Sequence, residues 1–207
     1  MTLNPEIVVR ARRDADLRAA LARADLTVAD GVGIVWAARR SGVVLPGRVP
    51  GVELAFTVMA LGGEALRVAF VGGRAGVAER AAEAARERWG VDVVMARDGY
   101  FDRQREGHDV ATQVARSGAQ LLLAGLGEGQ ELVLERYRAL WGVGAMIGVG
   151  GTLDVLAGVA TRTPAWTRRL GLEWAWRVGL DPARWHRLPR LARFVALTIR
   201  EARPGSP

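Results

Sequence analysis

Short apolar stretches alternate with longer amphipathic segments along most of the chain. The apolar stretches are rich in Val, Leu, Ile and Met and are bounded by Gly or Asp. They predict strands at residues 26–29, 66–71, 91–96, 120–126 and 145–149. The segments between them predict helices at residues 5–24, 74–89, 106–117 and 130–141. Nearly continuous apolar strands that alternate with helices are typical of a parallel sheet covered on both faces. The pattern therefore predicts an α/β fold with a Rossmann-like, mostly parallel sheet.

Four of the predicted strands run into a glycine turn, in the sequences ADGVG, FVGGR, AGLGEG and IGVGG. The carboxyl ends of parallel strands meet at one edge of a sheet, where ligands of such proteins bind, so we expect these turns to lie together. Any single turn is explained by the unusual backbone dihedrals that glycine allows. Four of them favour a nucleotide-type ligand whose phosphates are held by backbone N–H groups. The glycines concerned are Gly72, Gly73, Gly125, Gly127, Gly150 and Gly151.

Several reaction classes lack the residues that they need. The chain has no lysine, which excludes a P-loop, and the glycines of AGLGEG lack the spacing of a dinucleotide-binding motif, which disfavours hydride transfer. His108 and His186 are far apart and lack carboxylates at ligand spacing, so we expect no metal site. Without cysteine or a GxSxG motif, covalent catalysis is disfavoured. The reaction class that remains is one in which a carboxylate acts as the base and the protein binds a phosphate group.

Asp30 is the candidate base. It ends the predicted strand at 26–29, and Gly31 and Gly33 follow where the chain turns into a helix. An aspartate directly before a helix is a favourable N-cap. A carboxylate at the mouth of a ligand site can instead accept a proton. The position of Asp30 in the sequence supports both interpretations.

The chain changes character at residue 162, so we expect a core at 1–161 and a basic C-terminal appendage at 162–207. Residues 162–203 hold ten arginines against three acidic side chains, which equals the net charge of +7 of the whole chain. Four of the seven tryptophans lie in the same segment. This asymmetry implies an anionic partner, such as phospholipid, a pyrophosphate group or nucleic acid.

The last predicted helix of the appendage is amphipathic at about 100° per residue. Its Arg side chains and the interleaved tryptophans suit an anionic bilayer surface, although some tryptophans are expected to pack the appendage on the core. Leu197 falls on the basic side of this helix. The apolar side is predicted to comprise Leu191, Phe194, Val195 and Ile199, and the basic side Arg193, Arg200 and Arg203.

Several motifs, in order, resemble the WecG/TagA/CpsF glycosyltransferases of bacterial surface-polymer synthesis. They are TLNPEIV, ADLTVADGVGIV, RVPGVEL, VAFVGGRAGVAERAA with DGYF, AGLGEGQE, GVGGTLDVLAG, and RTPAWTRRLGLEWAWRV with DPARW. The resemblance implies inverting transfer of an N-acetylmannosamine-type sugar from a UDP donor to a polyprenyl-diphosphate-linked acceptor sugar, without a metal or other cofactor. It also implies a cytoplasmic protein, peripheral at the inner face of the plasma membrane, and it is compatible with a homo-oligomer.

The resemblance also implies roles for single residues. Asp30 matches the proposed catalytic base of the family. The residues expected to bind the donor, besides the glycines, are Thr2, Asn4, Arg48, Gln130, Glu131 and Asp154. The residues expected to meet the acceptor and the membrane are Arg162, Arg168, Arg169, Arg184, Arg187 and Arg190.

The chain departs from the family pattern in three places. Family members usually carry a further strand, helix and strand before TLN, whereas this chain begins at that motif. The pattern GLGxPKQE is GLGEGQE here, one residue shorter and without proline, which puts the position of Gln130 in question. Leu153 replaces the Phe of GVGGTFD, an apolar exchange that should not affect the chemistry.

One alternative comes from another class of protein. An Arg-rich appendage on an α/β scaffold also fits a nucleic-acid-binding protein. That interpretation accounts for the charge but not for the glycine turns or Asp30. We therefore expect a glycosyltransferase with no nucleic-acid partner.

Overall fold

The computed structural model describes residues 1–164, 166, 167, 173, 176, 179, 185 and 188–201 of the chain. The chain divides into two compact units. The first, which we call the sheet unit, comprises Met1 and residues 51–161. The second, the terminal unit, combines residues 2–50 with the residues from 162 onward.

The sheet unit is built on a four-stranded parallel sheet in the order β4-β3-β5-β6. Each neighbouring pair in this order is parallel, with Val68 of β3 opposite Val93 of β4 and Leu121 of β5. These positions confirm the predicted parallel α/β arrangement. The strands are β3 (Arg67–Gly72), β4 (Asp92–Arg97), β5 (Leu121–Gly125) and β6 (Ala145–Gly148).

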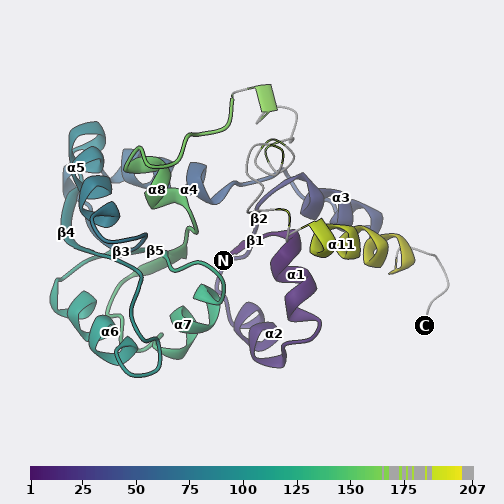
Figure 1. Cartoon of the computed structure of the whole chain (residues 1–207), viewed down its shortest axis with the longest axis horizontal. Helices are drawn as coiled ribbons and strands as arrows, with labels where there is room; N and C mark the ends of the chain where they lie inside the picture. Colours follow the sequence, from purple (N-terminus) through teal and green to yellow (C-terminus); the bar gives the residue numbers. More distant parts are fainter. Residues whose placement is uncertain are drawn as a thin grey trace. The chain divides into compact units, whose positions relative to one another are not determined.

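Helices cover both faces of this sheet (Figure 1). Successive side chains of β3 alternate between the faces: Val68 and Phe70 belong to one buried cluster, Ala69 and Val71 to the other. Because both faces are covered, the middle of each strand is apolar on both faces, which is the pattern visible in the sequence. One face carries α4 (Gly51–Gly62), α5 (Val77–Trp89) and α8 (Thr152–Leu156), and the other carries α6 (Gly107–Arg116) and α7 (Gln130–Arg136).

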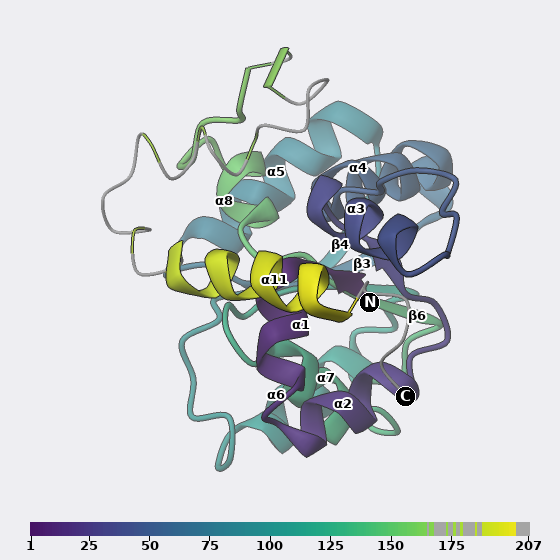
Figure 2. The same ribbon diagram turned by 90° about the vertical axis from the view of Figure 1, so that its right-hand side faces the viewer.

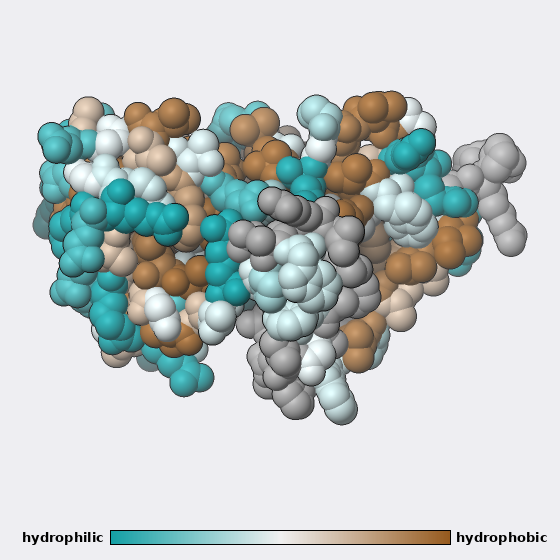
Figure 3. Space-filling model, turned by 90° about the horizontal axis from the view of Figure 1, so that it is seen from above, coloured by the Kyte–Doolittle hydropathy of each residue, from teal (hydrophilic) through white to brown (hydrophobic). Residues whose placement is uncertain are grey.

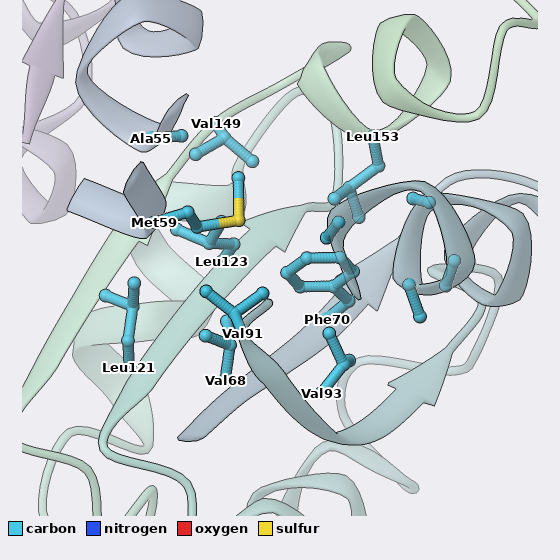
Figure 4. Close-up of a cluster of buried hydrophobic side chains, with 14 of the residues drawn as sticks. Ala55, Met59, Val68, Phe70, Val91, Val93, Leu121, Leu123, Val149 and Leu153 are labelled. Atoms are coloured by element: carbon cyan, nitrogen blue, oxygen red, sulfur yellow. The ribbon is translucent and has the colours of Figure 1, made fainter. Parts of the chain in front are cut away.

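The core under α4 is shown in Figure 4. Met59 of α4 lies over Leu123 of β5, and Phe70 of β3 lies between the sheet and α5 and α8. Helix α4 was not predicted, and a short 3₁₀ turn, η1 (Gly63–Ala65), connects it to β3. Met59 and Phe70 are completely buried, so this helix is an integral part of the core.

The terminal unit contains a separate two-stranded parallel sheet of β1 and β2. The predicted strand at 26–29 is β2, so the prediction that all five strands share one sheet is wrong. The predicted helix at 5–24 is two helices, because Asp14 Oδ1 accepts a 2.9 Å hydrogen bond from Leu17 N–H and starts α2 anew. The elements are β1 (Thr2–Leu3), α1 (Pro5–Ala11), α2 (Ala15–Ala22), β2 (Val28–Ala29), α3 (Val32–Arg40) and α11 (Leu188–Glu201).

Helix α11 lies against α1 and α3 (Figure 2). Phe194 is buried in a cluster with Val9 and Ile34, and Leu197 packs against the same cluster. The prediction that Leu191, Phe194, Val195 and Ile199 form one apolar side is wrong, because Phe194 is buried while Val195 and Ile199 are exposed. The helix has two apolar faces, and the one with Phe194 and Leu197 packs inward. Leu188, Val195 and Ile199 remain 41%, 44% and 47% exposed.

Candidate functional site

The glycine turns of the sheet unit meet at the carboxyl ends of its strands. Gly73 N–H donates a 3.2 Å hydrogen bond to the carbonyl oxygen of Gly125, and Gly99 N–H donates one of 2.9 Å to that of Gly73. Val149 N–H donates one of 2.8 Å to the carbonyl oxygen of Ala124. This confirms the expected common edge for FVGGR, AGLGEG and IGVGG. The fourth turn, ADGVG, belongs to the terminal unit.

Close backbone packing at this edge requires glycine at two positions. A Cβ atom on Gly72 would lie 2.6 Å from Gly125 Cα, and one on Gly125 would lie 2.7 Å from the carbonyl oxygen of Gly150. Gly127 and Gly150 differ from this pair, because a Cβ atom on either would have no neighbour within 4 Å. Their φ angles are positive, at 69° and 51°. The first pair is explained by packing alone, whereas the second pair borders open space.

Gln130 and Glu131 begin α7 directly after the AGLGEG turn. A Cβ atom on Gly148 would lie 2.8 Å from Gln130 Nε2, so this side chain lies over the carboxyl end of β6. Gln130 is 7% and Glu131 6% exposed. Despite its shorter motif, the chain thus places Gln130 at the strand-end edge. Gln130 Oε1 and Glu131 Oε2 are buried without a hydrogen-bond partner among the described residues.

Arg103 fixes the shortened turn, and sequence reasoning missed it. Its Nη1 donates a 2.7 Å hydrogen bond to the carbonyl oxygen of Glu128, and its Nη2 donates to that of Leu126. The carbonyl oxygen of Arg103 in turn accepts a 2.9 Å hydrogen bond from the Tyr137 hydroxyl. The contacts bridge two loops more than 20 residues apart, a relationship that no local pattern reveals.

Asp154 lies in the first turn of α8 and is half-buried. Its Oδ2 is 3.6 Å from the position of a Cβ built on Gly151, so the carboxylate is next to the turn that follows β6. The sheet unit thus brings Asp154 to the same edge as the glycine turns and Gln130. This edge combines backbone N–H groups with two carboxylates and an amide.

In the terminal unit, the predicted residues meet at the ends of β1 and β2. Asn4 follows β1 and Asp30 follows β2, and Asp30 N–H donates a 2.8 Å hydrogen bond to the carbonyl oxygen of Leu3. Val49 N–H donates one of 2.7 Å to the carbonyl oxygen of Ala29, which brings Arg48 to the end of β2. Asn4, Asp30 and Arg48 therefore lie near one another, while Thr2 is buried within β1.

Asp30 and Asn4 differ in whether they cap the helix that follows them. The N-cap of α3 is Gly31, with a φ of 109°, and Asp30 precedes it. Asn4 is the N-cap of α1, since its Oδ1 accepts a 3.0 Å hydrogen bond from Ile7 N–H. Asp30 therefore does not occupy the capping position that the sequence allowed, whereas Asn4 has a structural role that does not depend on a ligand.

Arg48 forms an ion pair with Glu173, a partner that the sequence did not indicate. Arg48 Nη1 lies 2.6 Å from Glu173 Oε1, and the two side chains are 22% and 18% exposed. Glu173 Oε2 also accepts a 3.4 Å hydrogen bond from the Thr163 hydroxyl. The glutamate belongs to the predicted appendage, so the appendage contributes directly to the surroundings of Arg48.

Of the arginines predicted to meet acceptor and membrane, the structure describes Arg162 and Arg190. Arg190 lies 3.7 Å from Glu6 and Arg162 is half-buried. The other four, Arg168, Arg169, Arg184 and Arg187, lie outside the described residues. In the part of the chain that the structure describes, no three or more His, Asp or Glu side chains are grouped to hold a metal ion. In that same part, no helix has the length and apolar character needed to span a bilayer.

Comparison with known proteins shows which family the chain is similar to. A model of the Glycosyl transferase WecG/TagA/CpsF family matches residues 1–206. The chain is also 31% identical over 209 residues to the N-acetylglucosaminyldiphosphoundecaprenol N-acetyl-beta-D-mannosaminyltransferase of Bacillus spizizenii. That alignment covers 100% of this chain and 80% of the relative.

Proposed function

Because the chain belongs to the WecG/TagA/CpsF glycosyltransferase family, we propose that it transfers an N-acetylmannosamine-type sugar from a UDP donor to a lipid-diphosphate-linked acceptor sugar. The name of the Bacillus relative supports both the sugar and the lipid-linked acceptor. The family also favours a transferase over the nucleic-acid-binding alternative. The observation that carries the mechanism is the position of Asp30 at the end of β2, beside Asn4 and Arg48 and outside the N-cap of α3.

In the proposed reaction, the Asp30 carboxylate takes the proton of the acceptor hydroxyl. The hydroxyl oxygen forms a bond to the anomeric carbon of the donor sugar from the face opposite UDP. The bond between this carbon and the UDP oxygen breaks, and its electron pair leaves with UDP. A single displacement of this kind inverts the anomeric carbon.

Arg48 is proposed to stabilise the leaving diphosphate. A guanidinium group forms strong, charge-assisted hydrogen bonds to phosphate oxygens, and its neutralisation of the developing charge requires no metal. The glycine-turn edge of the sheet unit is proposed to bind the donor nucleotide, with backbone N–H groups as phosphate ligands. Gly127 and Gly150 support this role, because the space beside them is open.

The C-terminal helix is proposed to hold the protein at the inner face of the plasma membrane. Leu188, Val195 and Ile199 are exposed on α11, and Arg193 and Arg200 are exposed on the same helix. Hydrophobic side chains also reach the surface around α3, where Val32 and Trp36 are exposed (Figure 3). Exposed apolar residues flanked by arginine suit the interface of an anionic bilayer.

The experiment that tests the function is a UDP-release assay on the full chain. Donors are UDP-linked N-acetylmannosamine, N-acetylglucosamine and glucose, each with a short-chain lipid-diphosphate-linked N-acetylglucosamine. We expect release above hydrolysis only with acceptor present, and fastest with N-acetylmannosamine. Release that does not depend on acceptor contradicts the proposal.

A further inference from the structure

Helix α3 begins two residues after Asp30 and has one side packed inward and one side exposed. On the inner side, a Cβ atom on Gly33 would lie 3.4 Å from Phe194 of α11, and Ile34 is buried in the same cluster. The outer side carries exposed residues whose spacing brings them together on one side of a helix: Val32, Trp36, Arg39 and Arg40. An exposed strip therefore leads along α3 from the proposed base.

Arg39 and Arg40 form a positive group at the far end of this strip. The guanidinium carbon of Arg40 lies 6.0 Å from the centre of the Trp36 ring, at the distance of a cation–π contact, which keeps it on the outer side. Among the described residues, no carboxylate forms an ion pair with either guanidinium. Arginine in the last turn of any helix is favourable because of the helix dipole. The dipole accounts for these charges, but not for the apolar residues beside them.

The turn after α3 places two valines next to the arginines. Gly42, with a φ of 78°, follows the helix, and its N–H donates a 3.2 Å hydrogen bond to the carbonyl oxygen of Arg39. Val43 N–H donates one of 2.9 Å to that of Ala38. These two bonds form a Schellman motif, which fixes the turn against the end of the helix. Val43 and Val44 are nevertheless 52% and 89% exposed, so the fold gains little from them, which favours a role in binding.

The acceptor of the proposed reaction consists of a sugar, a diphosphate and a long apolar chain, in that order. Its sugar hydroxyl has to reach Asp30. With a rise of 1.5 Å per residue, Arg39 and Arg40 lie about 10 to 12 Å along α3 from Val32. A sugar ring with its diphosphate extends over a similar length. The strip thus offers an aromatic ring, two cations and two aliphatic side chains in the order that the acceptor requires.

A diphosphate on the acceptor needs cations other than Arg48. Arg48 is proposed to bind the diphosphate that leaves with UDP, and its Nη1 pairs with Glu173. In a single displacement the acceptor approaches from the face opposite UDP, so the two diphosphates lie on different sides of the reacting carbon. Arg39 and Arg40 are exposed and belong to the helix that follows the base, which fits the second diphosphate.

We propose that the outer side of α3 and the turn after it bind the lipid-linked acceptor. Arg39 and Arg40 bind its diphosphate by charge-assisted hydrogen bonds, and Trp36 contacts its sugar. Val43 and Val44 contact the first isoprenoid units of its chain. This inference rests on the proposed function, because it takes the acceptor to be a sugar on a polyprenyl diphosphate.

The test is steady-state kinetics of the full chain in solution, without vesicles, at a saturating concentration of UDP-N-acetylmannosamine. The two acceptors are N-acetylglucosamine diphosphates that carry either a methyl group or two isoprenoid units. For Arg39→Gln with Arg40→Gln, we expect the KM for both acceptors to rise about 10-fold or more, because hydrogen bonds to a charged group are lost. The KM for the UDP-sugar should stay unchanged. An equal rise in both kinds of KM means a general disturbance of the site and contradicts the inference.

A second double variant tests the apolar part of the surface. For Val43→Ser with Val44→Ser, we expect the KM for the isoprenoid acceptor to rise about 3- to 10-fold, because apolar contacts with the chain are lost. The KM for the methyl acceptor should not change. A variant that loses no preference for the isoprenoid acceptor contradicts the contact with the chain.

Matched controls remove the same groups elsewhere. Arg13→Gln with Arg80→Gln removes two exposed arginines outside α3, and Leu61→Ser removes an apolar side chain of α4 that is 83% exposed. Both should keep the KM values of the wild type. If the α3 variants also keep these values and lose only co-sedimentation with anionic vesicles, the surface contacts the bilayer and the inference is overturned, while the proposed function stands. UDP release by the wild type that does not depend on acceptor overturns both.

Discussion

Arg48 and Glu173 are 125 residues apart in the sequence and form a 2.6 Å ion pair in the terminal unit. Because the pair is largely shielded from solvent, removal of one partner leaves the other poorly compensated. The appendage therefore helps to hold the arginine that we propose as the ligand of the leaving diphosphate.

We expect Glu173→Ala to raise the KM for the UDP-sugar about 3- to 10-fold, because Arg48 is no longer oriented. The melting temperature should fall by about 4 °C, as for a loss of order 1 kcal/mol. Steady-state kinetics and thermal denaturation provide the measurements. Glu201→Ala is the control, since Glu201 forms an exposed ion pair with Arg12, and such pairs contribute little. An unchanged KM in Glu173→Ala contradicts the positioning role.

Asp30→Asn should retain the fold and lose most of its turnover. The N-cap of α3 is Gly31, so the exchange leaves the cap intact, and Asn cannot take a proton from the acceptor. We expect kcat to fall about 100- to 10,000-fold at an unchanged melting temperature. UDP release and thermal denaturation are measured on the same preparation.

Asp14→Asn is the control for that experiment, because Asp14 caps α2 and Asn caps nearly as well. It should match the wild type in both measurements. Full activity of Asp30→Asn rejects this aspartate as the base.

Arg103→Ala should weaken nucleotide binding through the AGLGEG turn. Arg103 donates to two carbonyl oxygens of this turn, and its loss leaves Gln130 and Glu131 on a looser support. We expect a KM for the donor about 10-fold higher and kcat changed less, with partial recovery in Arg103→Lys. Arg105→Ala, at a side chain that is 88% exposed, should have no effect. Equal KM values for Arg103→Ala and Arg105→Ala contradict the prediction.

The exposed side of α11 can be tested separately from its buried side. Val195→Ser with Ile199→Ser should reduce co-sedimentation with anionic phospholipid vesicles about 10-fold or more at low salt, because two apolar contacts with the bilayer are lost. The melting temperature should stay unchanged, since both side chains are already exposed. Phe194→Ala, in contrast, should destabilise the terminal unit by about 3 kcal/mol or more. Wild-type co-sedimentation of the double variant argues against α11 as the anchor.

The periodicity of the sequence was enough to predict the strands of the sheet unit, but not its helix α4 or the two-stranded sheet of the terminal unit. Strands β3, β5 and β6 are continuous apolar runs because helices cover both faces, so their pattern is strong and local. Strand β1 has only two residues, too few for any periodicity. Sheet membership of β2 depends on pairing with the distant segment Thr2–Leu3, and a local pattern carries no information about such pairing.

The candidate site was also predicted only in part. The sequence predicted that Asp30 follows a strand and that the glycine turns after β3, β5 and β6 share one edge, because both depend on local turn chemistry. Arg103 and Glu173 were not predicted. Each interacts with a residue far along the chain, and a local sequence pattern does not show such contacts. The amphipathic pattern of α11 was misassigned for a related reason. It has two apolar faces, and neighbouring elements decide which one is buried.

The terminal unit takes its residues from both sides of the sheet unit in the sequence. During synthesis, residues 51–161 leave the ribosome as one stretch and can collapse on their own, whereas α1 and α3 must wait for Phe194 to fill their cluster. The segment that carries Asp30 and Arg48 is therefore synthesised early, but the cluster that packs it is complete only after α11 has been synthesised.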